Sequence, residues 1–142
     1  LLNMTYFEEI LISTKGNCDI KNITDETFAV INKSGVKNGI VTVFAVGSTA
    51  GITTVEFEPG LLIDLPKFWD KLIPAVGGYK HNDTWGDGNG HSHLRSALIK
   101  TSLTIPIVNS ETILGTWQQI VFLDFDNRPR TRRIAIQVMG DK

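Results

Sequence analysis

The chain has 142 residues, 42% hydrophobic and 20% charged, with a formal net charge of −1 at pH 7. This length is typical of one domain, here residues 1–142, and the near-zero charge disfavours nucleic acid and anionic membrane surfaces as partners. The chain has only one cysteine, Cys18, which excludes an intrachain disulfide and favours a reducing compartment, the cytoplasm. We expect no signal peptide or membrane anchor, because no apolar run approaches the roughly 20 residues of a membrane span.

The N-terminal half shows strand and helix signals in turn. Residues 4–14 are rich in aromatic and β-branched types with alternating faces, which predicts a first strand. After a loop, Thr24 is a candidate N-cap and Gly35 a stop signal, which predicts a short helix between them. The apolar run 39–46 predicts a central strand buried on both faces, and 52–57 predicts the strand adjacent to it.

The C-terminal half begins with apolar residues at near-helical spacing over 61–74, where Pro66 marks either a kink or the first turn of a helix. Residues 91–99 favour one short helix. Three further strands are predicted over 102–109, 113–125 and 132–140, the first two joined by a tight hairpin. These elements predict an α+β fold, with an antiparallel, sandwich-like β-sheet core and two or three short helices.

The segment 81–95 gathers all three histidines, with two acids and three glycines among them. In an extended backbone His91 and His93 project to one side, where they can share a divalent cation, Zn or Mg, with His81. Asp87 can then orient an imidazole or carry a metal-bound water. Solvated histidines in a flexible turn explain the same pattern without a metal.

A small-residue turn, 47–51, follows the predicted central strand. Ser48 and Thr49 can offer hydroxyl and backbone donors to a phosphate, although the turn lacks the lysine of a P-loop. Glu56 stands on a strand that is otherwise apolar and threonine-rich. It is either a buried general base or an exposed carboxylate on the strand's polar face.

Two C-terminal features complete the candidates. Gly115 interrupts a predicted strand, which often marks a bulge or a backbone approached by a ligand, while Trp117 fits the core equally well. An arginine at the start of the last strand can hold a phosphate with two hydrogen bonds, although most basic turns are only solvated. The arginines there are Arg128, Arg130, Arg132 and Arg133.

Four stretches together resemble the YjbQ-like family, described as secondary thiamine-phosphate synthase. They are GSTAGITTVEFEPG, DGNGHSHLRSALIKTSLTIPIVN, LGTWQQIVFLDFD and RTRRIAIQV, and the match runs from about Phe7 to Gly140. The resemblance implies an α+β fold around an antiparallel sheet and a homotrimer with its site near the subunit boundary. It also implies an activity that joins hydroxymethylpyrimidine diphosphate to thiazole phosphate and releases pyrophosphate.

The resemblance also implies site residues by position: Ser48, Thr49, Glu56, His81, Asp87, His93, Thr116 and Gln118. On this hypothesis His81, Asp87 and His93 hold the cation and diphosphate, while Glu56 manages a proton. Ser48 and Thr49 bind the other phosphate. Many members have a histidine where this chain has Gly47, and we expect His91 to replace that imidazole.

Two other functions fit the same residues. A metal-dependent hydrolase of a phosphorylated metabolite would use His81, His91 and His93 to activate water. A non-catalytic trimeric protein would hold metal or phosphate in this loop for structure alone. Cys18, remote from the histidines in sequence, is expected to be inert in all three cases.

Overall fold

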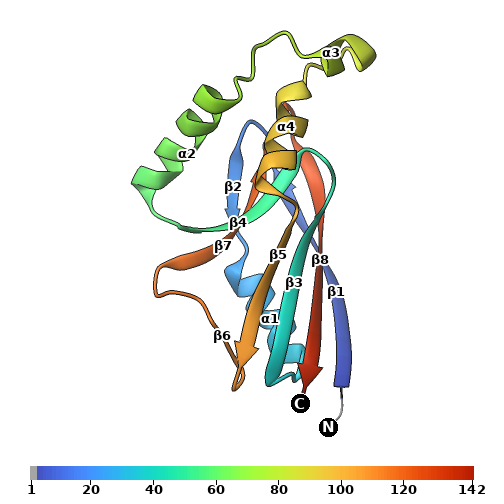
Figure 1. Ribbon diagram of the computed structural model, residues 1–142, viewed down its shortest axis with the longest axis vertical. Coiled ribbons are helices and arrows are strands. Elements are labelled where there is room, and N and C mark those ends of the chain that lie inside the picture. Colours follow the sequence, from blue (N-terminus) through green and yellow to red (C-terminus); the bar gives the residue numbers. More distant parts are fainter. Residues whose placement is uncertain (1–2) are drawn as a thin grey trace.

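The computed structural model describes residues 3–142, which form eight strands and four helices (Figure 1). The strands are β1 (Asn3–Thr14), β2 (Asp19–Asn22), β3 (Asn38–Val46), β4 (Ala50–Glu56), β5 (Ser102–Val108), β6 (Glu111–Thr112), β7 (Gln118–Asp124) and β8 (Arg130–Asp141). The helices are α1 (Thr24–Ser34), α2 (Pro59–Leu72), α3 (Lys80–Trp85) and α4 (Gly90–Ile99).

The strands form two antiparallel sheets. One has five strands in the order β1-β8-β3-β5-β6, and the other has three in the order β2-β7-β4. The α+β prediction is therefore confirmed, and β3 is the central strand of the larger sheet. The prediction that 39–46 and 52–57 are adjacent strands is wrong, because the turn at 47–49 carries the chain from one sheet to the other.

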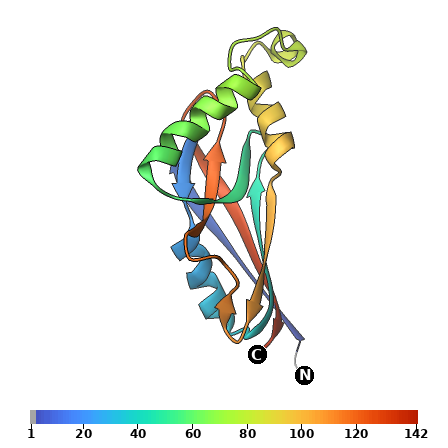
Figure 2. The ribbon, with the colours of Figure 1, turned by 60° about the vertical axis from the view of Figure 1, so that its left-hand side comes forward.

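The smaller sheet is the middle layer of the molecule (Figure 2). Ile120 and Phe122 of β7 pack, together with α1, against the inward residues of the larger sheet. Val121 and Leu123 point the other way, toward Trp69 of α2. β7 is thus buried on both faces, as its nearly unbroken apolar sequence IVFL requires.

The helix boundaries follow local signals with two corrections. Gly35 ends α1 with a φ of 71°, as predicted, but Ile23 is the N-cap. Thr24 instead accepts a hydrogen bond from the backbone N–H of Ile120 at 2.9 Å. Pro66 lies inside α2, not in its first turn. No helix in residues 3–142 is both long and apolar enough to cross a membrane.

Three further predictions need correction. The loop predicted after the first strand contains β2, a polar four-residue strand without a clear apolar pattern. The strand predicted over 113–125 is shortened to β7, since residues 114–117 form an irregular turn. The third correction is α3, a helix that was not predicted because its polar sequence KHNDTW has no apolar face to signal one.

The larger sheet has an outer face that no other element of the described chain covers. β3 alternates, with Val41, Val43 and Ala45 buried and Ile40, Phe44 and Val46 exposed. The prediction that both faces of this strand are buried is therefore wrong for the single chain. Apolar side chains of the neighbouring strands extend this outer sheet face. Phe7 of β1 is 57% exposed, and Met139 of β8 is 48% exposed.

Candidate active site

A polar hollow of about 440 Å³ lies where the β3–β4 turn, α3, the N-terminal part of α4 and the start of β8 meet. It is lined by Gly47, Ser48, Thr49, His81, Trp85, Asp87, Asn89, His93, Arg130 and Arg132, and we call it the histidine pocket. Five residues predicted as site residues therefore converge here, from the β3–β4 turn, α3, the α3–α4 connection and α4. α3 and α4 both lie at the end of the molecule where β4 begins (Figure 1).

Two of the three imidazoles meet in the pocket. The ring centroids of His81 and His93 are 4.3 Å apart. Nε2 of His81 lies 3.0 Å from Oδ1 of Asn89 and 3.7 Å from Asp87. Because the amide nitrogen of Asn89 donates to Asp126, its oxygen faces His81, so Nε2 carries the proton of a neutral His81. Nδ1 of that ring is then a proton acceptor.

His91 does not join this pair. α4 is helical, and side chains two residues apart on a helix point about 200° apart, whereas the prediction assumed an extended backbone. His91 is buried, with its Nε2 3.2 Å from the Ser92 hydroxyl. Within residues 3–142 no three His, Cys, Asp or Glu side chains are placed to hold a metal ion. The predicted three-histidine ligand set is therefore wrong, and His91 does not take the place of an imidazole at position 47.

One wall of the pocket is built from two arginines, each paired with a buried aspartate, and we call these two pairs the charged wall. Nε and Nη2 of Arg132 each lie 2.7 Å from the carboxylate of Asp124. Nε and Nη2 of Arg130 bond to one oxygen of Asp126 at 2.9 and 2.6 Å. Neither carboxylate is exposed. These bonds fix both guanidinium groups in position.

Asp126 also connects the charged wall to the rest of the pocket. Its oxygens accept hydrogen bonds from Thr49 and from Asn89, both at 3.3 Å. Burial favours its neutral form, but the backbone N–H of Asn127 and the side chains of Arg130 and Asn89 outweigh that effect and hold its pKa below the usual range. Asp126 is therefore an ionised anchor for three residues that line the pocket.

Asn89, Asp124 and Asp126 are site residues that the sequence analysis missed. A signal for the acids was present, because they alternate in LDFD and are followed within nine residues by the alternating arginines of RTRR. Two residues of the same kind at alternate positions face one side of a strand. Pairing the two sets across the β7–β8 turn would have identified the charged wall.

The remaining predicted site residues lie elsewhere. β4 runs from the pocket to Glu56, a span of roughly 20 Å at the usual rise per residue, and Glu56 is exposed. Gln118 is its partner on β7, and Thr116 precedes that strand. Trp117 is 70% exposed, so it does not belong to the core of the single chain. We call this region, residues 56 and 115–118, the GTWQ end.

The comparisons with known proteins agree with this fold over almost the whole chain. The family model described as "UPF0047 protein YjbQ-like" matches residues 8–141. The chain belongs to the YjbQ-like UPF0047 family. A UPF0047 protein of Methanothermobacter thermautotrophicus is 38% identical over 95% of this chain and 92% of its own length. UPF0047 protein YugU of Bacillus subtilis is 33% identical over 91% of this chain and 96% of its own length.

Solved structures give the same result. A YbjQ-like protein of unknown function from Sulfolobus solfataricus P2 has a TM-score of 0.94 and 31% identity, covering 99% of this UPF0047 chain and all of its own. A YjbQ/UPF0047 protein of Clostridium acetobutylicum has a TM-score of 0.84 and 35% identity, and the match covers 92% of this chain and 98% of that protein's chain. The YjbQ-like fold is thus shared at full length.

Gly47 has a distinct place in this YjbQ-like chain. A Cβ atom added there would lie 3.1 Å from Nη1 of Arg132. A histidine at this position, which the resemblance leads us to expect, would begin beside that guanidinium on the lining of the pocket. With glycine, the space next to Arg132 is left free for a ligand.

Burial shifts two of the histidines of this UPF0047 protein toward the neutral form. It lowers the pKa of His91, and the charge of Arg95 lowers it further. Burial likewise lowers the pKa of His93, with His81 as a second cause. Both rings are therefore neutral at pH 7, and each takes up a proton less readily than in the unfolded chain.

We expect this difference to appear in the pH dependence of stability. A folded-state pKa below the unfolded value near 6.5 means that the unfolded chain binds more protons as the pH falls through that value. The stabilising contribution is complete above pH 6.5 and decreases below it. The variant His91→Gln should therefore lose less unfolding free energy than the wild type between pH 7 and 5, measured by urea denaturation. Parallel curves for the two proteins would contradict this assignment.

Proposed function

We propose that the histidine pocket binds the phosphate groups of a phosphorylated small molecule, and that the protein is a thiamine-phosphate synthase-type transferase. The observation that carries the proposal is the charged wall. Two arginines, fixed by buried aspartates, line one pocket together with Ser48 and Thr49. Fixed N–H and O–H donors of this kind suit phosphate oxygens.

The proposed reaction joins hydroxymethylpyrimidine diphosphate to thiazole phosphate. The thiazole nitrogen attacks the pyrimidine methylene carbon, and the bond from that carbon to the diphosphate oxygen breaks, so pyrophosphate leaves. Negative charge grows on the leaving oxygens in the transition state, and donors already in place stabilise it without reorganising. We assign this role to Arg132, whose Nη1 faces the free space beside Gly47, and to Arg130.

The histidine pair and Asp87 complete this proposal. An approaching phosphate favours the protonated form of His93, which then donates a hydrogen bond to it. Asp87 is an exposed carboxylate on the same pocket and would repel a diphosphate unless a cation lies between them. The side chains do not fit a resident three-ligand metal site. A divalent ion, Mg²⁺ rather than Zn²⁺, is therefore proposed only as a companion of the diphosphate, which is how proteins commonly bind Mg²⁺.

We propose further that the protein acts as a homotrimer in the cytoplasm and that the GTWQ end of one copy meets the histidine pocket of another. Two observations support this assembly. Glu56, Thr116 and Gln118 are too far from the pocket of their own chain to share its substrate. The outer sheet face also exposes more large apolar side chains than a solitary sheet needs. Glu56 of the neighbouring copy would then lie beside the reacting groups, where it can pass a proton to the departing pyrophosphate oxygen.

The test is product formation from the two phosphorylated precursors, followed by rescue of a thiamine-requiring host that lacks its ordinary synthase. Wild type should form thiamine phosphate and rescue growth, whereas His93→Ala and Glu56→Gln should each fail. Co-expressing these two variants should restore part of the activity, because mixed trimers contain some sites with both native residues. Activity in either single variant at the wild-type level would remove that residue from the site.

The hydrolase alternative has less support than it had from sequence. It requires three histidines around a metal-bound water, and His91 is outside the pocket. Release of inorganic phosphate from simple phosphoesters, with no thiamine phosphate formed, would nevertheless favour it. Absence of turnover with every phosphorylated substrate would favour the non-catalytic trimer. No covalent nucleophile is needed, and burial raises the pKa of the Cys18 thiol to about 11, so it is protonated at neutral pH.

A further inference from the structure

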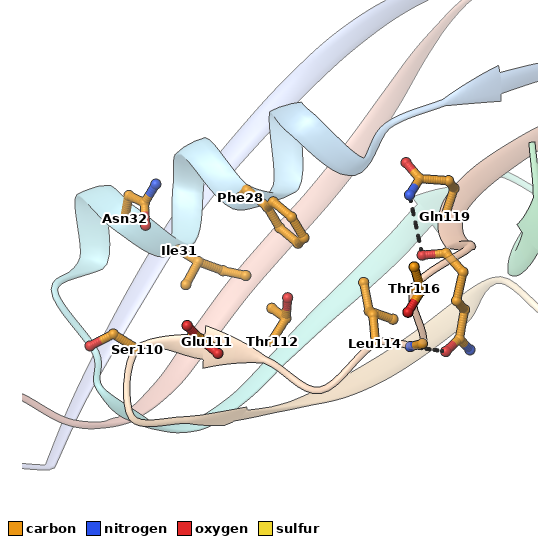
Figure 3. A pocket seen from close by; sticks show the side chains of 11 residues that line it. Phe28, Ile31, Asn32, Ser110, Glu111, Thr112, Leu114, Thr116 and Gln119 are labelled. Carbon is orange, nitrogen blue, oxygen red and sulfur yellow. Dashed lines mark hydrogen bonds between the residues drawn. The ribbon is translucent and has the colours of Figure 1, made fainter.

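A second hollow, of about 420 Å³, lies between α1, the tip of the β5–β6 hairpin and the segment before β7 (Figure 3). Its volume is within the range of small-molecule sites. It shares no lining residue with the histidine pocket. We call it the α1 hollow.

Local structure holds this hollow open. Asn109 and Ser110 have φ angles of 51° and 68°, the left-handed pair of a tight hairpin turn, so β6 begins at once after β5. Gln118 closes the following loop. Its Oε1 accepts the N–H of Gly115 at 3.0 Å, and its Nε2 donates to the hydroxyl of Thr54 at 2.8 Å. Both polar atoms of Gln118 are therefore engaged within the chain, and its role here is to shape the loop.

The lining has an apolar side and a polar rim. Phe28 and Ile31 point from α1 across the hollow toward Leu114 (Figure 3). Hydroxyl and amide groups of Asn32, Ser110, Thr112 and Thr116 stand around them. This combination of an aromatic ring, aliphatic side chains and scattered hydrogen-bonding groups is that of a site for a small, partly apolar organic molecule.

Charge narrows the class of ligand. Among the lining residues that the structure describes, Glu111 alone is ionisable, and it is exposed at the rim. No lysine, arginine or histidine is among the described residues that line it. An anion such as a phosphate would meet a carboxylate here and no cation to balance it. A ligand with a positive group would instead pair with Glu111.

We propose that the α1 hollow is a second binding site, for a small aromatic organic cation. The flat ring lies against Phe28 and Leu114, and the cationic group lies at Glu111. Within one chain the α1 hollow and the histidine pocket share no lining residue, although Thr116 and Gln118 also belong to the GTWQ end that we propose meets the pocket of a neighbouring copy. The resemblance assigns Thr116 and Gln118 to the substrate, whereas in the α1 hollow Thr116 lies on the rim and Gln118 forms part of the supporting loop.

Three probes of the same shape and different charge test the proposal: benzamidine, benzamide and benzoate. Binding is followed by the amide chemical shifts of residues around the hollow in ¹⁵N-labelled full-length protein. Benzamidine should bind about fivefold more tightly than benzamide, the upper end for an exposed ion pair, and benzoate should bind most weakly. Equal affinities, or no shifts at the hollow with any probe, would overturn the proposal.

Two matched variants test whether Glu111 causes the preference for benzamidine over benzamide. Glu111→Gln should bring the affinity for benzamidine down to that for benzamide and leave benzamide unchanged. Glu26→Gln, which changes an exposed acid of α1 outside the hollow, should change neither. A loss of the preference in both variants would show a general charge effect and would contradict the site. Because Glu111 does not line the histidine pocket, Glu111→Gln should keep the pyrophosphate affinity of the wild type. Loss of benzamidine binding at the hollow can therefore be told apart from loss of phosphate binding in the histidine pocket.

Discussion

Arg132→Met should lower the free energy of unfolding by about 3–5 kcal/mol, the usual cost of leaving a buried charge without its partner. Arg132 is 8% exposed, and it provides two bonds of 2.7 Å to Asp124, a carboxylate with no exposure, and a third to Thr49. Methionine keeps much of the volume but none of the donors. Such a loss is a large fraction of the total stability of an ordinary domain. Urea denaturation followed by circular dichroism measures it.

The adjacent residue is the matched control. Arg133 has the same charge on the same strand, but its side chain is 58% exposed and pairs with Glu9 at the surface. Arg133→Met should therefore cost about 0–1 kcal/mol, as exposed ion pairs do. If the two variants were equally stable, the charged wall would contribute no more than a surface pair. That result would contradict the interpretation of Arg132 and Asp124 as a buried pair that stabilises the fold.

Asp126→Asn should reduce the affinity for inorganic pyrophosphate by at least about tenfold, equivalent to 1.4 kcal/mol. The carboxylate accepts from Arg130, Asn89 and Thr49 together, and an amide of the same shape can only partly replace it, because its NH₂ group is a donor facing other donors. Three pocket residues should lose their orientation at once. Isothermal titration at a temperature where the variant is folded measures the loss.

Two controls separate orientation from a general effect of charge or folding. Asp83→Asn removes an exposed acid of α3 whose side chain is 76% exposed, and it should leave pyrophosphate affinity unchanged. Within the Asp126→Asn variant, benzamidine binding at the α1 hollow should also be unchanged if the fold is intact. Retained pyrophosphate affinity in Asp126→Asn would show that the phosphate does not depend on the charged wall.

The strands and the end of α1 could be predicted because their signals are local. β8 places Ile134, Ile136 and Val138 in the core and Arg133 and Gln137 outside, as the alternation indicates. A tight turn does follow β5 at Asn109 and Ser110, but the hairpin partner is β6, whereas the predicted partner, 113–125, becomes β7 of the other sheet. Pro106 is tolerated in β5 because its outer neighbour, β6, pairs with only Ile107 and Val108.

Sheet membership and the direction of His91 could not be predicted, and for different reasons. Which sheet a strand joins depends on residues far away in the chain, so β3 and β4 looked like neighbours although they are not. The motif His-Ser-His has opposite meanings in the two regular structures. Its imidazoles share a side in a strand and diverge in a helix, and the short stretch 91–99 fits both patterns.

The candidate site was predicted in part. The sequence named five residues of the histidine pocket individually, Ser48, Thr49, His81, Asp87 and His93, and the cluster of candidate arginines included two more, Arg130 and Arg132. The buried acids were missed, because an aspartate at the end of a strand is ordinarily exposed and only its arginine partner shows otherwise. Glu56 was also predicted as a site residue, but it lies at the far end of β4 from the pocket. Its residue type indicates a candidate general base, whereas its distance from the pocket depends on its position along the strand.

The four ionic groups of the charged wall all lie within residues 124–132, with partners four and eight positions apart. Closing so short a loop has a small entropic cost, so these pairs can form as soon as β7 meets β8 in a refolding chain. Thr49 and Asn89 must reach Asp126 from 77 and 37 residues away. Competence to bind pyrophosphate should therefore be among the last properties that a refolding molecule gains, after much of its secondary structure has returned.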